Sequence, residues 1–399
     1  MEDFHIEPMQ IQTLNLVSAS PGQRLSIPVF RFGAAAPDVA APVVAAISDE
    51  PGAAGKPPLK AMIQAALHAD EVPAMLVAQA LRHKLAALDA AGQVIGEVVL
   101  VPYANPMGLG QQVLGQHQGR FDLRDGINFN RNVPDLSDSV NAALQGRLGE
   151  DAARNVALVR EALRQAAAAL SANHPAEDLK IQLLRLAVDA DVVLDMHCDS
   201  QAALHLYALT PQSDLAIELG TLMGARAILL ATESDGSPFD EACSRPWLEV
   251  QLQHPDKPVP LACFSTTIEL RGEADTGHEM AAADADAIIE FLRRRGLIAG
   301  AAAVLPPTLC EATPLSGSEP IVAPHAGVVV FRCEPGTRLN AGDVVADIVS
   351  VDTGEVTAVR ALSSGVLYAR IATRWATAGK RLGKVAGSTL ARTGKLLSA

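Results

Sequence analysis

The alternation of short apolar runs with longer segments of helical periodicity is the feature that most restricts how this chain can fold. The apolar runs at 60–67, 96–101, 191–196, 226–231 and 264–270 have the length of buried strands. The segments 73–92, 150–171, 175–188 and 278–295 space their apolar residues as amphipathic helices do. Strands that alternate with helices predict an α/β domain with a mostly parallel central sheet. Before them we expect a strand pair within residues 1–30 and a loop over 42–57.

The composition of the sequence changes near residue 300. Residues 301–320 are rich in Ala, Pro, Ser and Gly and are predicted to be a linker, which leaves an α/β domain at 1–300 and a β-rich domain at 321–399. In the latter, a weak repeat places Gly365 38 positions after Gly327 (365 − 327). Two such copies would close a small β-sandwich that resembles the barrel-sandwich hybrid of biotinyl and lipoyl carriers. Those carriers need a lysine at a turn that here reads Asp352-Thr-Gly-Glu355, so we expect a structural or gating cap instead of a swinging arm.

Composition excludes several classes of protein. The net charge is −13 and no Lys/Arg run stands against it, which argues against nucleic-acid binding and against an anionic membrane surface. No run approaches the 18 apolar residues of a membrane span, and the first ten residues lack the apolar stretch of a signal peptide. The five cysteines form no CxxC pair and are odd in number, as expected in a reducing compartment. We therefore expect a cytoplasmic enzyme or binding protein with a small-molecule partner, possible homo-oligomerisation, and no membrane or nucleic-acid partner.

Three groups of metal-binding character follow predicted strands. His68 and Glu71 stand three residues apart after the first strand of the α/β pattern, His197 ends the strand 191–196, and Glu269 lies near the end of the strand 264–270. In open α/β sheets, sites form at the carboxyl ends of strands. Two histidines and one glutamate are the ligand set of a catalytic zinc that keeps an open position for water. A carboxylate that does not bind the metal must then accept a proton, and Glu269 is the candidate.

The long segment 102–135 supplies the remaining candidates. An arginine near the metal would stabilise a tetrahedral oxyanion, and both Arg120 and Arg124 lie in this segment. The pair Asn130-Arg131 could hold a substrate carboxylate in a bidentate manner.

The order of these elements resembles the zinc carboxypeptidase superfamily, and within it the succinylglutamate desuccinylase/aspartoacylase family of deacylases. The matching motifs are LHADE (67–71), NFNRNVPD (128–135), LDMHCD (194–199) and TIELRG (267–272). The resemblance implies a zinc-carboxypeptidase-like central mixed, mostly parallel sheet flanked by helices, followed by a small all-β barrel-sandwich-type domain. It also implies one Zn²⁺ per chain, bound by His68, Glu71 and His197.

The resemblance assigns roles to further residues. It implies that Asn130 and Arg131 bind the substrate carboxylate, that Glu269 is the general acid/base, and that an arginine before the Asn-Arg pair stabilises the oxyanion. Gly-Arg-Phe-Asp at 119–122 fits that slot better than Arg124, so Arg120 is our choice. One departure concerns Asn128, where the family usually has an aspartate that orients a ligand histidine. A neutral amide raises the basicity of the ligand less, which predicts weaker metal binding.

These residues predict a zinc-dependent deacylase that cleaves the amide bond of an N-acyl amino acid or a similar small carboxylate-bearing substrate. A metallocarboxypeptidase acting on peptides is an alternative, because it would use the same groups. A non-catalytic metal or small-molecule binding protein with a vestigial site is a second alternative. The presence of both Glu71 and Glu269 disfavours it, because a degenerate site would tend to lose the base.

Overall fold

The core of the molecule is a nine-stranded mixed sheet. The computed structural model describes residues 9–33, 59–389, 392–393 and 396, so the loop predicted at 42–57 lies outside the described residues. In spatial order the strands are β1 (Gln10–Asn15), β2 (Ser26–Phe32), β4 (Glu97–Val101), β3 (Lys60–Ala65), β7 (Val192–Asp199), β11 (Phe264–Gly272), β9 (His205–Leu209), β10 (Ala227–Ala231) and β12 (Ala312–Pro314). The pairs β1–β2, β2–β4 and β11–β9 are antiparallel and the other pairs are parallel. The prediction of a mostly parallel central sheet is confirmed.

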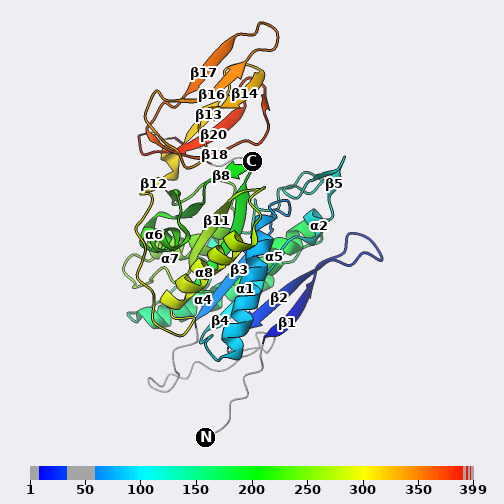
Figure 1. The fold of residues 1–399 in the computed structure, drawn as a ribbon. Coiled ribbons are helices and arrows are strands. Elements are labelled where there is room, and N and C mark those ends of the chain that lie inside the picture. Colours follow the sequence, from blue (N-terminus) through cyan, green and yellow to red (C-terminus); the bar gives the residue numbers. More distant parts are fainter. Residues whose placement is uncertain (1–8, 34–58, 390–391, 394–395, 397–399) are drawn as a thin grey trace.

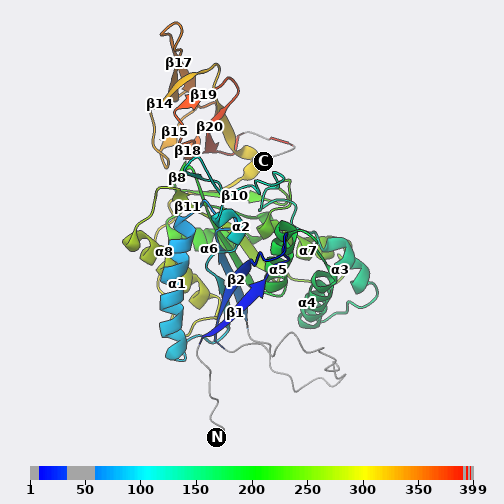
Figure 2. The same ribbon diagram turned by 90° about the vertical axis from the view of Figure 1, so that its right-hand side faces the viewer.

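Helices cover both faces of this sheet, as Figures 1 and 2 show. One face packs its apolar side chains against α1 (Pro73–Ala90), α6 (Ser213–Met223) and α8 (His278–Arg294). The other packs against α3 (Ser137–Leu144), α4 (Ala152–Ala169), α5 (Pro175–Ala187) and α7 (Phe239–Gln253). The sheet therefore lies between two buried apolar layers. These layers hold in place the strand ends that carry the candidate site residues. Among the described residues, no helix has the length and apolar character needed to cross a membrane.

Some elements differ from the sequence-based expectations. The helices α6 and α7 were not predicted, and α7 carries Pro246 in its interior. The segment predicted as a long loop contains the short helix α2 (Pro106–Leu109) and a small hairpin of β5 (Gln112–Val113) and β6 (Gln116–His117). Strand β7 extends beyond the predicted 191–196, so His197 lies within a strand that is paired on both sides instead of at its end.

The C-terminal strands form a separate β unit, defined here as residues 319–386. Its strands are β13 (Glu319–Val322), β14 (Gly327–Phe331), β15 (Arg338–Leu339), β16 (Val344–Val349), β17 (Val356–Arg360), β18 (Gly365–Arg370), β19 (Trp375–Ala376) and β20 (Arg381–Ala386). One sheet has the order β13-β20-β18-β15 and the other β17-β16-β14-β19, and an apolar core lies between them. This agrees with the predicted small all-β architecture. The segment predicted as a linker contributes β12 to the edge of the central sheet before the C-terminal β unit begins.

The C-terminal β unit sits on the end of the central sheet at which β7 finishes (Figure 1). The two-residue strand β8 (Gln201–Ala202), which follows β7 directly, pairs antiparallel with β18 of the unit. Segments that are more than 160 positions apart in the sequence, such as Gln201 and Arg370, therefore share one sheet across the boundary.

Candidate metal centre and active-site cavity

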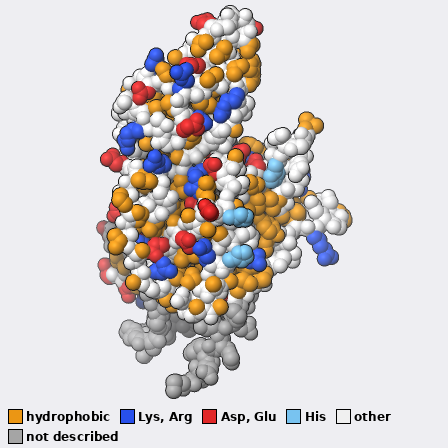
Figure 3. Space-filling view, viewed as in Figure 1, with side chains coloured by type: hydrophobic (Ala, Val, Ile, Leu, Met, Phe, Trp, Pro, Cys, Tyr) orange, Lys and Arg blue, Asp and Glu red, His pale blue; other side chains and the backbone are white. Residues whose placement is uncertain are grey.

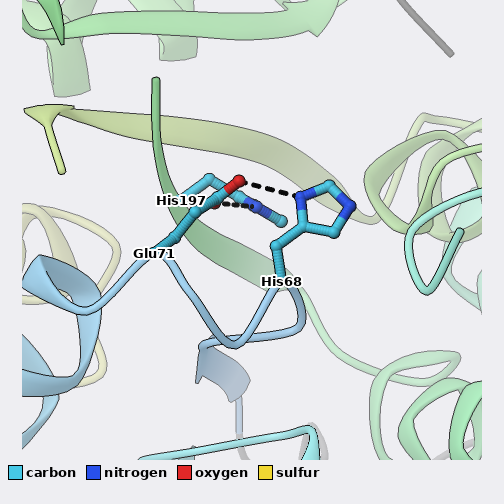
Figure 4. Close-up of side chains that lie close together, drawn as sticks. All are labelled: His68, Glu71 and His197. Atoms are coloured by element: carbon cyan, nitrogen blue, oxygen red, sulfur yellow. Dashed lines mark hydrogen bonds and ion pairs between the residues drawn. The ribbon is translucent and has the colours of Figure 1, made fainter. Parts of the chain in front are cut away.

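Two of the predicted metal ligands come from one turn and the third from a neighbouring strand. His68 and Glu71 lie in the turn between β3 and α1, where Ala66 adopts a positive φ of 57° and redirects the chain at the end of the strand. His197 lies on β7, which pairs directly with β3. Figure 4 shows the dashed lines that join the Glu71 carboxylate to the His68 and His197 rings.

The three side chains present their donor atoms to one another. Nδ1 of His68 lies 2.9 Å from Oε1 of Glu71, and Nδ1 of His197 lies 2.7 Å from Oε2 of the same carboxylate. All three residues are buried, and their ligand atoms lie within 4.8 Å of one another. Although burial favours the neutral acid, the imidazoles of His197 and His68 hold the pKa of Glu71 well below its usual value. Glu71 is therefore an anion aimed at the same point as two imidazole nitrogens.

The opposite nitrogen of each imidazole faces an oxygen acceptor. Nε2 of His68 lies 2.9 Å from Oδ1 of Asn128, and Nε2 of His197 lies 3.0 Å from Oδ2 of Asp195. Asp195 is in turn held by Gln64, whose Nε2 donates to Oδ1 at 2.9 Å. In metal sites, a histidine commonly places its far nitrogen on such an acceptor, which leaves the near nitrogen free to bind the metal.

This arrangement fits a zinc ion. When both Nε2 atoms carry the protons, the two Nδ1 lone pairs and the Glu71 carboxylate all point to one buried centre, where a cation would relieve their mutual repulsion. Nitrogen from two histidines and oxygen from one carboxylate is a donor set that zinc favours in catalytic sites. Among the described residues, these three could thus hold a metal.

Arg120 and Arg124 occupy different environments. Nη1 of Arg120 lies 3.2 Å from Nδ1 of His68 and 3.3 Å from Oε1 of Glu71, so its guanidinium borders the centre. Arg124 instead binds Asp122 through Nε at 2.9 Å and Nη2 at 2.5 Å. Of the two candidate arginines, Arg120 is the one that the structure brings beside the predicted ligands.

Asn130 and Arg131 line the same cavity as Arg120. Nδ2 of Asn130 lies 3.2 Å from Nε2 of His197, and its Oδ1 accepts the backbone N–H of Phe239 at 2.8 Å. Arg131 is half-buried and donates from Nη1 to its neighbour's carbonyl oxygen at 2.7 Å. Gly236 packs against Arg131: its φ is +91°, and a Cβ there would lie 2.8 Å from Cδ of the arginine. The backbone at 236 therefore needs glycine to let the arginine reach the cavity.

Glu269 stands on β11 directly opposite His197 in the parallel register. One of its carboxyl oxygens, Oε2, is buried and has no hydrogen-bond partner among the described residues. Burial, together with the neighbouring Glu71 carboxylate, raises the pKa of Glu269 to about 8. A carboxyl group poised near neutral pH is suited to accepting and returning a proton.

These residues line a single cavity of about 560 Å³. Its walls include all seven predicted site residues, and further lining side chains come from α7 and from the C-terminal β unit. Lys380, Arg381 and Lys384 of that unit reach the cavity, and sequence reasoning missed them because no local pattern reveals where the unit docks. Figure 3 shows acidic and basic side chains interspersed over the face that includes the junction.

The chain is similar to proteins of one family. The family model described as the succinylglutamate desuccinylase/aspartoacylase catalytic domain matches residues 57–246. No curated protein sequence matches the chain. A crystal structure from Shewanella amazonensis, described as a succinylglutamate desuccinylase/aspartoacylase family protein, is 25% identical with a TM-score of 0.79, and the match covers 94% of this chain and 98% of that one.

Two further solved structures share the fold. A protein of Shewanella frigidimarina with the same family description is 23% identical with a TM-score of 0.80, covering 96% of this chain and 98% of that one. The product-bound ectoine utilization protein EutE (DoeB) of Ruegeria pomeroyi is 16% identical with a TM-score of 0.63, covering 96% of each chain. The matches extend over the central sheet and the C-terminal β unit alike.

Proposed function

Since the chain belongs to the succinylglutamate desuccinylase/aspartoacylase family, we propose that it is a zinc-dependent hydrolase that cleaves the amide bond of an N-acyl amino acid or a similar small carboxylate-bearing substrate. The observation that carries this proposal is the convergence of two Nδ1 atoms and one carboxylate on a buried point beside Glu269. Zinc bound by His68, Glu71 and His197 would activate a water molecule and polarise the substrate carbonyl.

The remaining chemistry belongs to side chains of this chain. Glu269 accepts the proton of the attacking water through its carboxylate and returns a proton to the nitrogen of the leaving amine. The raised pKa of Glu269 suits the second half of this cycle, and positive charge nearby favours the ionised form needed for the first half. Nη1 of Arg120 donates to the oxygen on which negative charge develops.

Substrate recognition is assigned to the wall that carries Asn130 and Arg131. The guanidinium of Arg131 can hold a carboxylate through two parallel N–H groups, which fixes the distance between that carboxylate and the scissile amide. The cavity of about 560 Å³ has room for a small substrate beside the reacting groups.

Metal analysis of purified protein tests the ligand set. His68→Ala and His197→Ala should each lose bound zinc, whereas His83→Ala, which removes an exposed histidine from α1, should retain it. Full zinc content in the first two variants would refute the site.

Turnover of a panel of N-acyl amino acids by the zinc-loaded protein tests the reaction. Glu269→Gln should retain zinc yet lose about 10²–10⁴-fold in kcat. Dipeptides in the same panel distinguish a deacylase from a carboxypeptidase. If Glu269→Gln left every measured turnover unchanged, a vestigial site would be the better description.

A further inference from the structure

The C-terminal β unit grips the stretch of chain that follows the metal-ligand strand. Nζ of Lys384, on β20, lies 2.6 Å from Oδ2 of Asp199, the last residue of β7. Nε of Arg370 and Nη2 of Arg374 donate to Oε1 of Gln201 at 2.8 Å and 3.0 Å. The backbone N–H of residue 203 donates to the carbonyl of residue 368 at 2.9 Å, next to the β8–β18 pairing. Each of these contacts therefore joins a residue of the segment 199–203 to a residue of the C-terminal β unit.

Asp199 is the member of this stretch that bears on the chemistry. It follows His197 by two positions on a β-strand, so both side chains point to the same face of the sheet, and both line the cavity. The side chains of Lys384 and Asp199 are only 21% and 24% exposed, which limits the ability of water to compensate either charge alone. Nζ of Lys384 also lies 5.7 Å from the centre of the Tyr368 ring, which holds the ammonium in place from the side of the C-terminal β unit.

Both parts of the molecule contribute charge to the cavity. The carboxylates that line it all belong to residues 70–273, as do Arg120 and Arg131, whereas Lys380, Arg381 and Lys384 come from the C-terminal β unit. Among the described residues, Lys384 is the one of these three with an ion pair to a lining carboxylate. Without it, the carboxylate of Asp199 would face the cavity alongside Glu269 and Glu71, where it would repel an anionic substrate.

We propose that Lys384 is a positioning residue for the proposed hydrolysis: it clamps Asp199, fixes the segment 199–203 against the C-terminal β unit, and cancels a carboxylate charge that would oppose a carboxylate-bearing substrate. The second part rests on the proposed function, whereas the clamp itself does not. On this view the C-terminal β unit is a part of the active site that cannot be exchanged without changing substrate binding.

Amide hydrogen exchange on the full-length protein tests the clamp. In Lys384→Met, the amides of residues 199–203 should exchange at least about tenfold faster, since a hydrogen bond between charged groups no longer resists local opening. Arg332→Met is the matched control, because it removes an ion pair of the C-terminal β unit that does not cross the boundary, between Arg332 and Asp347. Unchanged exchange at 199–203 in Lys384→Met would overturn the clamp. If that variant does not fold, Asp199→Asn weakens the same pair from the other side and is expected to give the same acceleration.

Steady-state kinetics with N-acetylglutamate and N-acetylglutamine, which differ by one charge, test the electrostatic part. Lys384→Met should raise KM about tenfold for N-acetylglutamate and about threefold for N-acetylglutamine, which keeps one of the two carboxylates, while changing kcat far less. The double variant Lys384→Met/Asp199→Asn should restore KM because the unpaired carboxylate is gone, and Lys384→Arg should retain the parent value. Equal effects on both substrates, or no rescue by the double variant, would overturn the charge-cancelling role. Absence of turnover by the parent on any N-acyl amino acid would refute the proposed function instead, and exchange at 199–203 would still decide the clamp.

Discussion

Replacing Asn128 by aspartate is the most informative single change at the candidate metal centre, because Asn128 stands where the family resemblance implies an acid. Its Oδ1 is 2.9 Å from Nε2 of His68 and accepts the backbone N–H of Asn130 at 2.8 Å. Its Nδ2 is buried and has no acceptor among the described residues. The substitution therefore converts an unpaired donor into a carboxylate oxygen and turns two neutral hydrogen bonds into charge-assisted ones.

The expected magnitude follows from these contacts. A hydrogen bond to a charged group contributes about 1.5–3 kcal/mol, against about 1 kcal/mol for a neutral one. A gain of about 1 kcal/mol at the Nε2–H of His68 makes its Nδ1 a better ligand and lowers the zinc dissociation constant about fivefold. Asn128 is only 8% exposed, so in the zinc-free protein a carboxylate at this position would be buried without a nearby metal charge, and we expect the free energy of unfolding to fall by about 1–3 kcal/mol.

Competition with a fluorescent chelator measures the zinc affinity, and thermal unfolding with and without zinc measures stability. Asn128→Asp should bind zinc more tightly and gain more stability from saturating zinc than the parent. Asn141→Asp is a suitable control, since it places the same charge at a buried asparagine of α3 whose Nδ2 binds a backbone carbonyl, and it should destabilise without changing zinc affinity. An unchanged or weaker zinc affinity in Asn128→Asp would refute this account of the centre.

Three further outcomes are expected. Arg120→Met should retain zinc but lower kcat about 10²–10³-fold, as measured by steady-state kinetics, because the developing oxyanion loses a donor. Gly236→Ala should lower the melting temperature and raise KM, because a Cβ at a φ of +91° meets Cδ of Arg131; an unchanged KM would argue against a role of Arg131 in binding. Burial lowers the pKa of His205 to about 4, so the unfolded chain binds a proton below about pH 6.5 that the folded chain does not. This lowers the free energy of unfolding by up to about 3 kcal/mol as the pH falls from about 6.5 to 4, and His205→Phe should flatten denaturant-measured stability over that range.

The sequence was most informative where chemistry and periodicity coincide. The spacing of His68 and Glu71 after an apolar run places both on one turn, and the preference for strand ends as sites brought His197 and Glu269 into the same hypothesis. The structure brings all four together, with His197 and Glu269 opposite each other in the register of β7 and β11. Local patterns succeed here because buried parallel strands are continuous apolar runs that end where polar residues begin.

The features that the sequence did not reveal depend on contacts between distant segments. Helix α7 escaped prediction because Pro246 and several polar residues interrupt its apolar spacing, yet packing against the sheet holds it. The motif at 119–122 favoured Arg120 over Arg124, but the sequence did not reveal that Arg124 is paired with Asp122. No motif in the sequence around Lys384 indicates a function, because its contact with Asp199 forms only when β20 packs against the end of β7.

The shared pairing of β8 and β18 also bears on how the molecule tolerates truncation. A chain that stopped at residue 300 would leave the backbone groups of β8 without the strand that satisfies them, and it would also lack β12 at the far edge of the central sheet. Exposed strand edges of this kind template association between chains. Shortened forms of this protein should therefore aggregate, and the α/β part expressed alone should not stay monomeric unless it retains the strands that close both borders.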